Sequence, residues 1–210
     1  EFTREFMNFE PEAWSLRWYR QMVGISSPGD TTVVTNKWML GTRNSFIIGI
    51  CATFLATALG TVAALGLSRP HMPFKGTIMA ILISPMIVPL IITAAGMFFF
   101  YSKVGLTHSY LGLILAHTAL GTPFVVITVT ATLTGFDTNL IRASQSLGAD
   151  TMRTFFKVIM PLILPGVISG ALFAFITSFD EVVVVMFVGS VEQITIPKQM
   201  WAGLRQETSP

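Results

Sequence analysis

Charged residues are scarce in this chain of 210 residues: they make up 11% of it, whereas a typical globular domain contains about 25%. The formal net charge of +2 is too small to indicate a nucleic-acid partner. The only cysteine is Cys51, so the sequence supports neither a disulfide framework nor a cysteine-based metal cluster. We expect Cys51 to be a small packed residue.

Catalytic signatures are absent as well. The sequence contains no G-x-x-x-x-G-K-[ST] phosphate loop, no H-E-x-x-H zinc motif and no G-x-S-x-G nucleophile elbow. We therefore expect that the chain is not an enzyme and has no cofactor or metal of its own. Any energy that it uses must come from a partner or from an ion gradient.

Long apolar runs are what the sequence does contain. Hydrophobic residues make up 52% of the chain, and the mean hydropathy is +0.67. Four apolar runs reach the ~20 residues that a helix needs to cross a bilayer, the last of them interrupted: 45–67, 77–100, 111–133 and 162–189. Because lipid cannot pair with backbone polar groups, and because the runs lack the alternation of barrel strands, we predict an all-α membrane protein with about four spans.

Residues within these runs indicate how the helices pack. A stripe of small residues recurs at every fourth position of the first run, where another helix can approach closely: Ala52, Ala56, Gly60 and Ala64. Pro85 and Pro89 each remove a backbone donor from the second run and predict a kink, which either serves packing or lines a pathway. His117 has no second ligand at metal spacing, so we expect a buried histidine with a hydrogen-bond partner.

A polar segment, residues 137–161, separates the last two apolar runs. Its first part, 138–147, predicts a short helix that ends at Gly148, because glycine adopts the left-handed conformation at little cost. Asp150 is a good N-cap for a second helix that continues to Pro161. One face of that helix is apolar: Met152, Phe155, Phe156 and Ile159. We interpret the segment as helix, glycine and amphipathic helix, exposed outside the membrane.

The acidic pair Asp180-Glu181 lies inside the last apolar run. An ionised side chain in a bilayer costs roughly 3 kcal/mol or more, so such groups usually face a protein interior or a wet cavity. One hypothesis is that one or both residues line a solvent-accessible path and favour cationic groups. The alternative is that the pair lies near the membrane edge, or that one carboxylate caps or pairs with a neighbouring helix.

The polar segment resembles the cytoplasmic loop of the permease subunits of ATP-binding-cassette importers. The loop of that family reads Glu-Ala-Ala, three residues, Gly, nine residues, Ile-x-Leu-Pro. Five positions match or are conservative replacements: Ala143, Gly148, Val158, Met160 and Pro161. Ser144 replaces the second alanine, and Arg142 replaces the glutamate, which reverses its charge.

The resemblance extends over most of the chain and is closest to the spermidine and putrescine subgroup. It is carried by the stretches TRNSFIIGICAT, GLSRPHMPFKG, SPMIVPLII, GTPFVVITV and SFDEVVVVMFVG. It implies the type I importer permease fold, in which the loop is a coupling helix seated in a groove of the ATPase. The implied coupling residues are Arg142, Ala143, Ser144, Gly148, Met152, Phe155, Phe156 and Pro161.

The resemblance also implies partners and a location. These are a dimer of ATP-binding-cassette ATPases that binds ATP and magnesium, a second permease subunit, an extracytoplasmic solute-binding protein and the lipid of a bacterial inner membrane. The implied organisation has four parts: an extracytoplasmic interfacial segment 1–44, a transmembrane domain 45–189, its cytoplasmic loop 134–161, and an extracytoplasmic segment 190–210. We expect the terminal spans of the family to be missing from this sequence.

Two other functions are compatible with the residues alone. An ion-coupled secondary transporter or channel could bind its ion at Asp180 and Glu181 and would need no ATPase. A membrane scaffold could use the polar segment 137–161 to recruit a cytosolic protein without transporting anything.

Overall fold

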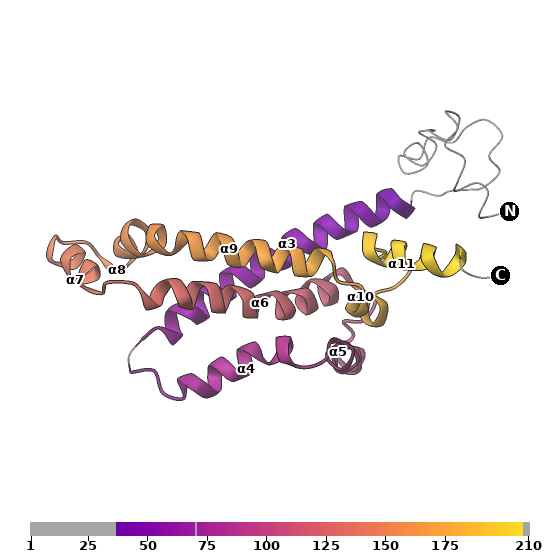
Figure 1. Cartoon of the computed structure of the whole chain (residues 1–210), viewed down its shortest axis with the longest axis horizontal. Coiled ribbons are helices and arrows are strands. Elements are labelled where there is room, and N and C mark those ends of the chain that lie inside the picture. The colour runs from indigo at the N-terminus through magenta and orange to yellow at the C-terminus, as the bar shows by residue number, and fades with distance from the viewer. Residues whose placement is uncertain (1–36, 70, 208–210) are drawn as a thin grey trace, which may run out of the picture.

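The computed structural model of the chain describes residues 37–69 and 71–207. Within these ranges every regular element is helical, and the helices form an elongated bundle (Figure 1). The predicted all-α membrane class is thereby confirmed. The predicted interfacial segment 1–44 lies outside the described residues as far as position 36.

Three helices are long and apolar enough to cross a membrane: α3 (Lys37–Leu67), α6 (Tyr110–Thr134) and a helix over Thr151–Phe179. The third is continuous but contains three parts: α8 (Thr151–Thr154), the π-helical turn η2 (Phe155–Ile159) and α9 (Met160–Phe179). The first span begins at Lys37 rather than at the predicted position 45, because no proline interrupts the chain there. Residues 37–44 therefore form the first two turns of α3.

The second apolar run forms two helices instead of one straight span. Helix α4 (Lys75–Ile87) and helix α5 (Leu90–Val104) are bent by 103° relative to each other. The break falls at Pro89, which lacks a backbone donor and pushes the preceding Val88 into an extended conformation. Pro85 lies within α4 without ending it. The apolar run 77–100 is thus broken and not one straight helix, and the predicted kink falls at Pro89.

The last apolar run is also divided. Helix α9 ends at Phe179, and the chain then forms the short helix α10 (Val183–Val188) and, further on, α11 (Ile196–Glu207). The division falls at the acidic pair, so the interruption predicted within 162–189 is a helix end. Helix α5 packs mainly against α10, beside the bundle.

Close contacts between α3, α6 and α9 form the core of the bundle. The predicted stripe of small residues on α3 is buried in it, as expected: Ala52, Ala56, Gly60 and Ala64. A Cβ atom added to Gly60 would lie 2.7 Å from the Cβ atom of Val125 on α6, so only glycine allows this approach. Cys51 is exposed and not packed, because it lies beside the stripe on α3 and is not part of it.

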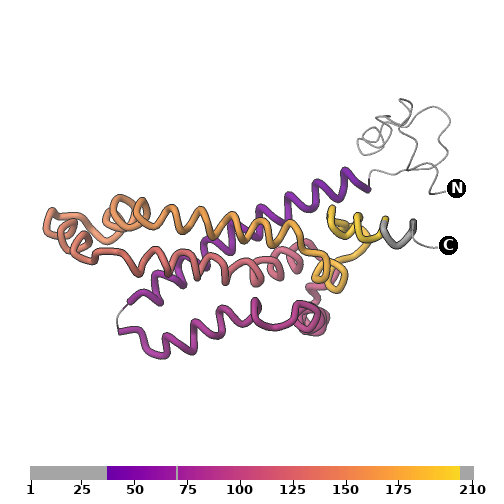
Figure 2. Tube along the Cα trace, viewed as in Figure 1, coloured from indigo at the N-terminus to yellow at the C-terminus, as the bar shows by residue number. Residues whose placement is uncertain are grey.

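The two ends of the bundle differ in what they carry. The polar segment with α7 (Asn139–Ser146) and α8 protrudes at one end, while α5, α10 and α11 gather at the other (Figure 2). The third long helix connects the two ends, since it begins at Thr151 and reaches Phe179. A feature at either end is therefore joined to the other by one helix.

Candidate functional site

The polar segment folds as predicted in its first half. Helix α7 ends at the C-cap Leu147, and Gly148 follows with φ +81°, in the left-handed region that favours glycine. The carboxylate of Asp150 then accepts a hydrogen bond of 2.8 Å from the backbone N–H of Arg153 and caps α8. The glycine that ends α7 and the aspartate that caps α8 thus determine the turn, as the sequence predicts.

The second half differs from the prediction at Pro161. The amphipathic helix does not end there, because the helix continues through Pro161 into α9 directly after the π-helical turn Phe155–Ile159. The loop helix therefore runs without interruption into the membrane span. No break in the helix separates the loop from α9.

The predicted apolar face of the loop helix is divided by the π-helical turn. Met152 and Phe156 are 65% and 60% exposed, while Phe155 and Ile159 are partly buried. A π-turn adds a residue to the helical turn, so the regular spacing of one face is lost. Two large apolar side chains are consequently left on the outside of the loop.

One cavity of about 440 Å³ lies between the inner side of the loop and the ends of α3 and α6. Its walls include Leu65, Arg69, Phe136, Ile141, Met152 and Phe155. Beside it, the hydroxyls of Ser144 and Thr154 lie 2.9 Å apart and join α7 to α8. The serine that replaces the family's second alanine thus acquires a partner within the loop.

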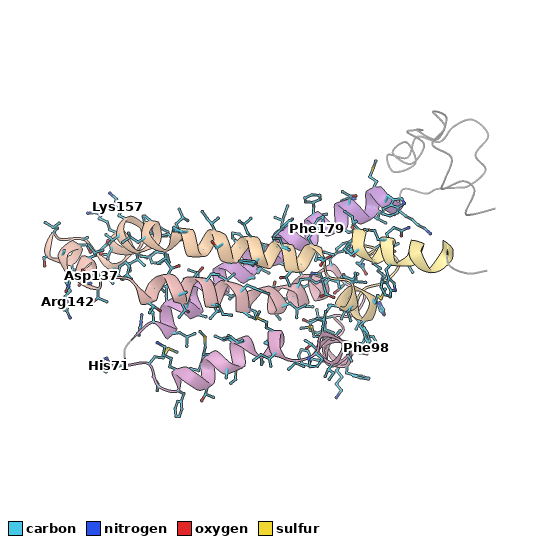
Figure 3. All side chains as sticks on the ribbon, viewed as in Figure 1. His71, Phe98, Asp137, Arg142, Lys157 and Phe179 are labelled. Atoms are coloured by element: carbon cyan, nitrogen blue, oxygen red, sulfur yellow. The ribbon has the colours of Figure 1, made fainter. Side chains whose placement is uncertain are left out.

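Arg142 and Lys157 are exposed at the same end of the bundle, as Figure 3 shows. Both belong to the surface that a partner docking on the loop would meet, together with the exposed Phe156. The structure brings the predicted coupling residues into one protruding element. Ala143 is exposed on α7, and Pro161 is exposed at the start of α9.

The acidic pair at the other end is divided between two environments. Asp180 is the C-cap of α9 and is exposed, whereas Glu181 is only 7% exposed. The Oε1 atom of Glu181 accepts a hydrogen bond of 2.9 Å from the backbone N–H of Val184 at the start of α10. The capping alternative therefore describes Glu181, and Asp180 is the exposed member of the pair.

Both carboxylates contribute to one open cavity of about 390 Å³ between α9, α10 and the start of α5. Its walls are otherwise mostly apolar: Leu90, Ile176, Thr177, Val182 and Val183. Asp180 provides the exposed negative charge at this cavity. The combination suits a ligand with a cationic group on an aliphatic chain.

A polar clamp at the same end was not predicted from the sequence. The side-chain amide of Asn44 on α3 donates to the carbonyls of Glu192 and Ile194, each at 2.9 Å. The Tyr110 hydroxyl donates to the Oδ1 atom of Asn44 at 2.9 Å, so the amide is fully used. The only signal in the sequence is a polar residue at the start of an apolar run, which does not identify its partners.

His117 is a buried histidine with a hydrogen-bond partner, as predicted. Its Nδ1 atom lies 2.8 Å from the Oγ atom of Ser178 on α9, and both residues are buried. The bond joins α6 to α9 close to the end of α9 that carries Asp180.

These features define a class of protein: an all-helical membrane subunit with a helix–glycine–helix loop at one end and a carboxylate-lined cavity at the other. The chain belongs to the family described as binding-protein-dependent transport system inner membrane component, which matches residues 56–207. The predicted resemblance to importer permeases is confirmed by this match. The chain is accordingly a multi-pass transport subunit of the inner membrane and not an enzyme.

Curated relatives agree with the predicted subgroup. The spermidine/putrescine transport system permease protein PotC of Haemophilus influenzae is 29% identical over 209 residues, which cover 100% of this chain and 77% of that protein. The putrescine transport system permease protein PotI of Escherichia coli K12 is 28% identical over 94% of this chain and 69% of its own length. The spermidine/putrescine transport system permease protein PotC of the same strain is 28% identical over 89% of this chain and 73% of its own length.

Proposed function

We propose that this chain is the permease subunit of an ATP-driven importer for a small cationic solute of the polyamine class. The observation that carries the proposal is the continuous helix over Thr151–Phe179, which has the coupling loop at its start and Asp180 at its end. With 29 residues, this helix has a length of about 43 Å. One continuous helix therefore connects the motor end to the solute end.

Coupling takes place at the loop. ATP and magnesium bound by the partner ATPases close the ATPase dimer, and the loop moves with the groove in which it is seated. Its rim is cationic, with Arg142, Arg153 and Lys157, and its exposed apolar contacts are Met152 and Phe156. The backbone conformation of Gly148, with φ +81°, holds α7 and α8 in one arrangement. A movement of the loop therefore tilts α9 and does not merely deform the loop.

The solute is bound at the cavity of Asp180. A polyamine consists of protonated amines joined by methylene groups, so it needs negative charge for the amines and apolar walls for the chain. Asp180 provides the charge, and Leu90, Ile176 and Val183 provide apolar surface. The names of the relatives PotC and PotI, which specify spermidine and putrescine, support the same class of solute.

The remaining partners are a second permease subunit and an extracytoplasmic solute-binding protein. The open side of the Asp180 cavity is where the second permease completes the path. The binding protein delivers solute at the end of the bundle that carries α10 and α11. In this arrangement the loop of α7 and α8, which lies at the opposite end of the bundle (Figure 1), faces the cytoplasm.

Reconstitution of the whole transporter tests this proposal. The complex with its ATPases and second permease is placed in proteoliposomes and given binding protein loaded with radiolabelled putrescine. We expect uptake that requires ATP, persists without an ion gradient, and stops with an ATPase variant that cannot hydrolyse ATP. Uptake that collapses with the ion gradient and ignores ATP would instead establish the ion-coupled alternative.

A further inference from the structure

Helices α6 and α9 pack side by side in layers that repeat every four residues. In one layer, a Cβ atom added to Gly170 would lie 2.7 Å from the Cα atom of Val125. In the next, a Cβ atom added to Gly121 would lie 3.0 Å from the Cβ atom of Ala174. One further step along both antiparallel helices pairs His117 with Ser178. The hydrogen-bonded pair is thus the outermost of these layers.

In this layer a side-chain hydrogen bond joins the two helices, whereas the two layers before it rest on the close approach of Gly170 and Gly121 to the facing helix. The side chains of His117 and Ser178 are 1% and 7% exposed, so lipid and water are both excluded. The Nε2 atom of His117 is buried and has no partner within the described residues. Burial of an unpaired polar atom opposes folding, so close packing alone does not account for a histidine at this position.

The position of Ser178 determines where Asp180 points. Successive residues of a helix are turned by about 100°, so Asp180 lies about 200° from Ser178, on nearly the opposite face. Asp180 still has helical backbone angles, with φ −90° and ψ −2°. When Ser178 is held against α6, Asp180 faces away from the core and into the cavity with Ile176 and Thr177.

We propose that His117 is a positioning residue for the solute-binding carboxylate: its bond to Ser178 fixes the rotation of the α9 terminus and so directs Asp180 into the cavity. The contact between His117 and Ser178 is present in this chain whatever its function. The consequence for transport rests on the proposed function. The Nδ1 atom of His117 and the Ser178 hydroxyl lie 2.8 Å apart and form one hydrogen bond, in which the histidine tautomer decides the donor.

Thiol labelling measures the position of the side chain at 180 without requiring transport. The assembled transporter carries Cys51→Ala, which removes the exposed native thiol, and Asp180→Cys. A quaternary-ammonium thiol reagent then labels position 180 from the cavity. We expect His117→Leu and Ser178→Ala each to slow labelling about threefold, the effect of a typical hydrogen bond between membrane helices. His117→Asn restores the rate, because its side-chain amide can either accept from or donate to the Ser178 hydroxyl.

A matched control shows whether the whole protein has changed. Val191→Cys places a thiol on a loop residue that is 78% exposed and lies outside the α6–α9 contact. Its labelling rate should not respond to His117→Leu. Equal labelling at position 180 with histidine or leucine at 117, or failure of His117→Asn to restore the rate, would overturn the positioning role.

Uptake of radiolabelled putrescine tests whether the orientation of the side chain at position 180 affects transport. We expect His117→Leu to lower the maximal rate per assembled complex about threefold or more. In the Asp180→Asn background the same change should cause no further loss, because the carboxylate that His117 positions is gone. An equal loss in both backgrounds would show a general structural role and contradict the proposal. If the wild-type complex takes up no putrescine, the proposed function fails, and the labelling result still decides whether His117 positions residue 180.

Discussion

Asp180 and Glu181 are neighbours in the sequence but have different roles in the structure. Asp180 ends α9 and is exposed at the cavity, whereas the Glu181 carboxylate turns inward and caps the backbone of α10 through the N–H of Val184. A helix end between the two side chains separates them. Substitutions at the two positions should therefore change different measurable properties.

Asp180→Asn should reduce uptake of a cationic solute without destabilising the subunit. The change keeps the size of the side chain and removes its charge, and a hydrogen bond to a charged group contributes roughly 1.5–3 kcal/mol, so we expect about a tenfold or greater loss of uptake. The rate of putrescine uptake and the melting temperature in detergent are measured together. An uptake rate equal to that of the wild type would remove Asp180 from the solute path.

Glu181→Ala should instead lower the stability of the subunit. The alanine variant leaves the buried N–H of Val184 without its partner, which costs about 1 kcal/mol for a lost cap. Glu181→Gln is the matched control, because the amide oxygen can still accept this hydrogen bond. We expect a lower melting temperature for alanine and little change for glutamine. If both variants melt at the wild-type temperature, Glu181 does not hold α10 in place.

Gly148→Pro should abolish uptake while leaving membrane insertion intact. Proline fixes φ near −65°, which is incompatible with the φ of +81° at this position, so the helix–glycine–helix turn cannot form. Gly148→Ala should give an intermediate loss, since a left-handed alanine costs roughly 1–2 kcal/mol although its Cβ atom meets nothing within 4 Å. Uptake and ATPase binding are measured on membranes with equal amounts of the subunit.

Gly76→Ala is a suitable control for this series. Gly76 is also exposed with no atom within 4 Å of an added Cβ, but its φ is not in the left-handed region. Normal uptake is expected for this variant. Wild-type transport by Gly148→Pro would show that the turn is dispensable for coupling.

The features that the sequence predicts correctly are those that local chemistry determines. Gly148 ends a helix and Asp150 begins one because backbone conformation and capping need only a few neighbouring residues. The small-residue stripe on α3 can also be predicted from the sequence, because its four-residue spacing places every member on one face of the helix. For these features no knowledge of the tertiary structure is required.

The features that the sequence does not predict depend on distant contacts. Pro85 and Pro89 have the same local effect, yet only Pro89 breaks the helix, and the direction of the 103° bend depends on the packing of α5 against α10. Likewise, nothing in the pair Asp180-Glu181 shows which carboxylate turns inward until α10 is placed. The partners of Asn44 lie almost 150 residues away, at Glu192 and Ile194.

The close approach of α3 to α6 provides a test of the bundle that does not involve function. Gly60→Ala adds a Cβ atom 2.7 Å from the Val125 Cβ atom, closer than real contacts allow, so the two backbones must separate. Overpacking of this kind costs about 1–3 kcal/mol, which should lower the melting temperature in detergent by several degrees. Gly96→Ala on α5 is the control, since its added Cβ atom meets nothing within 4 Å and alanine favours the helix. If both variants melt alike, α3 does not approach α6 at Gly60, and the core of the bundle must be arranged differently.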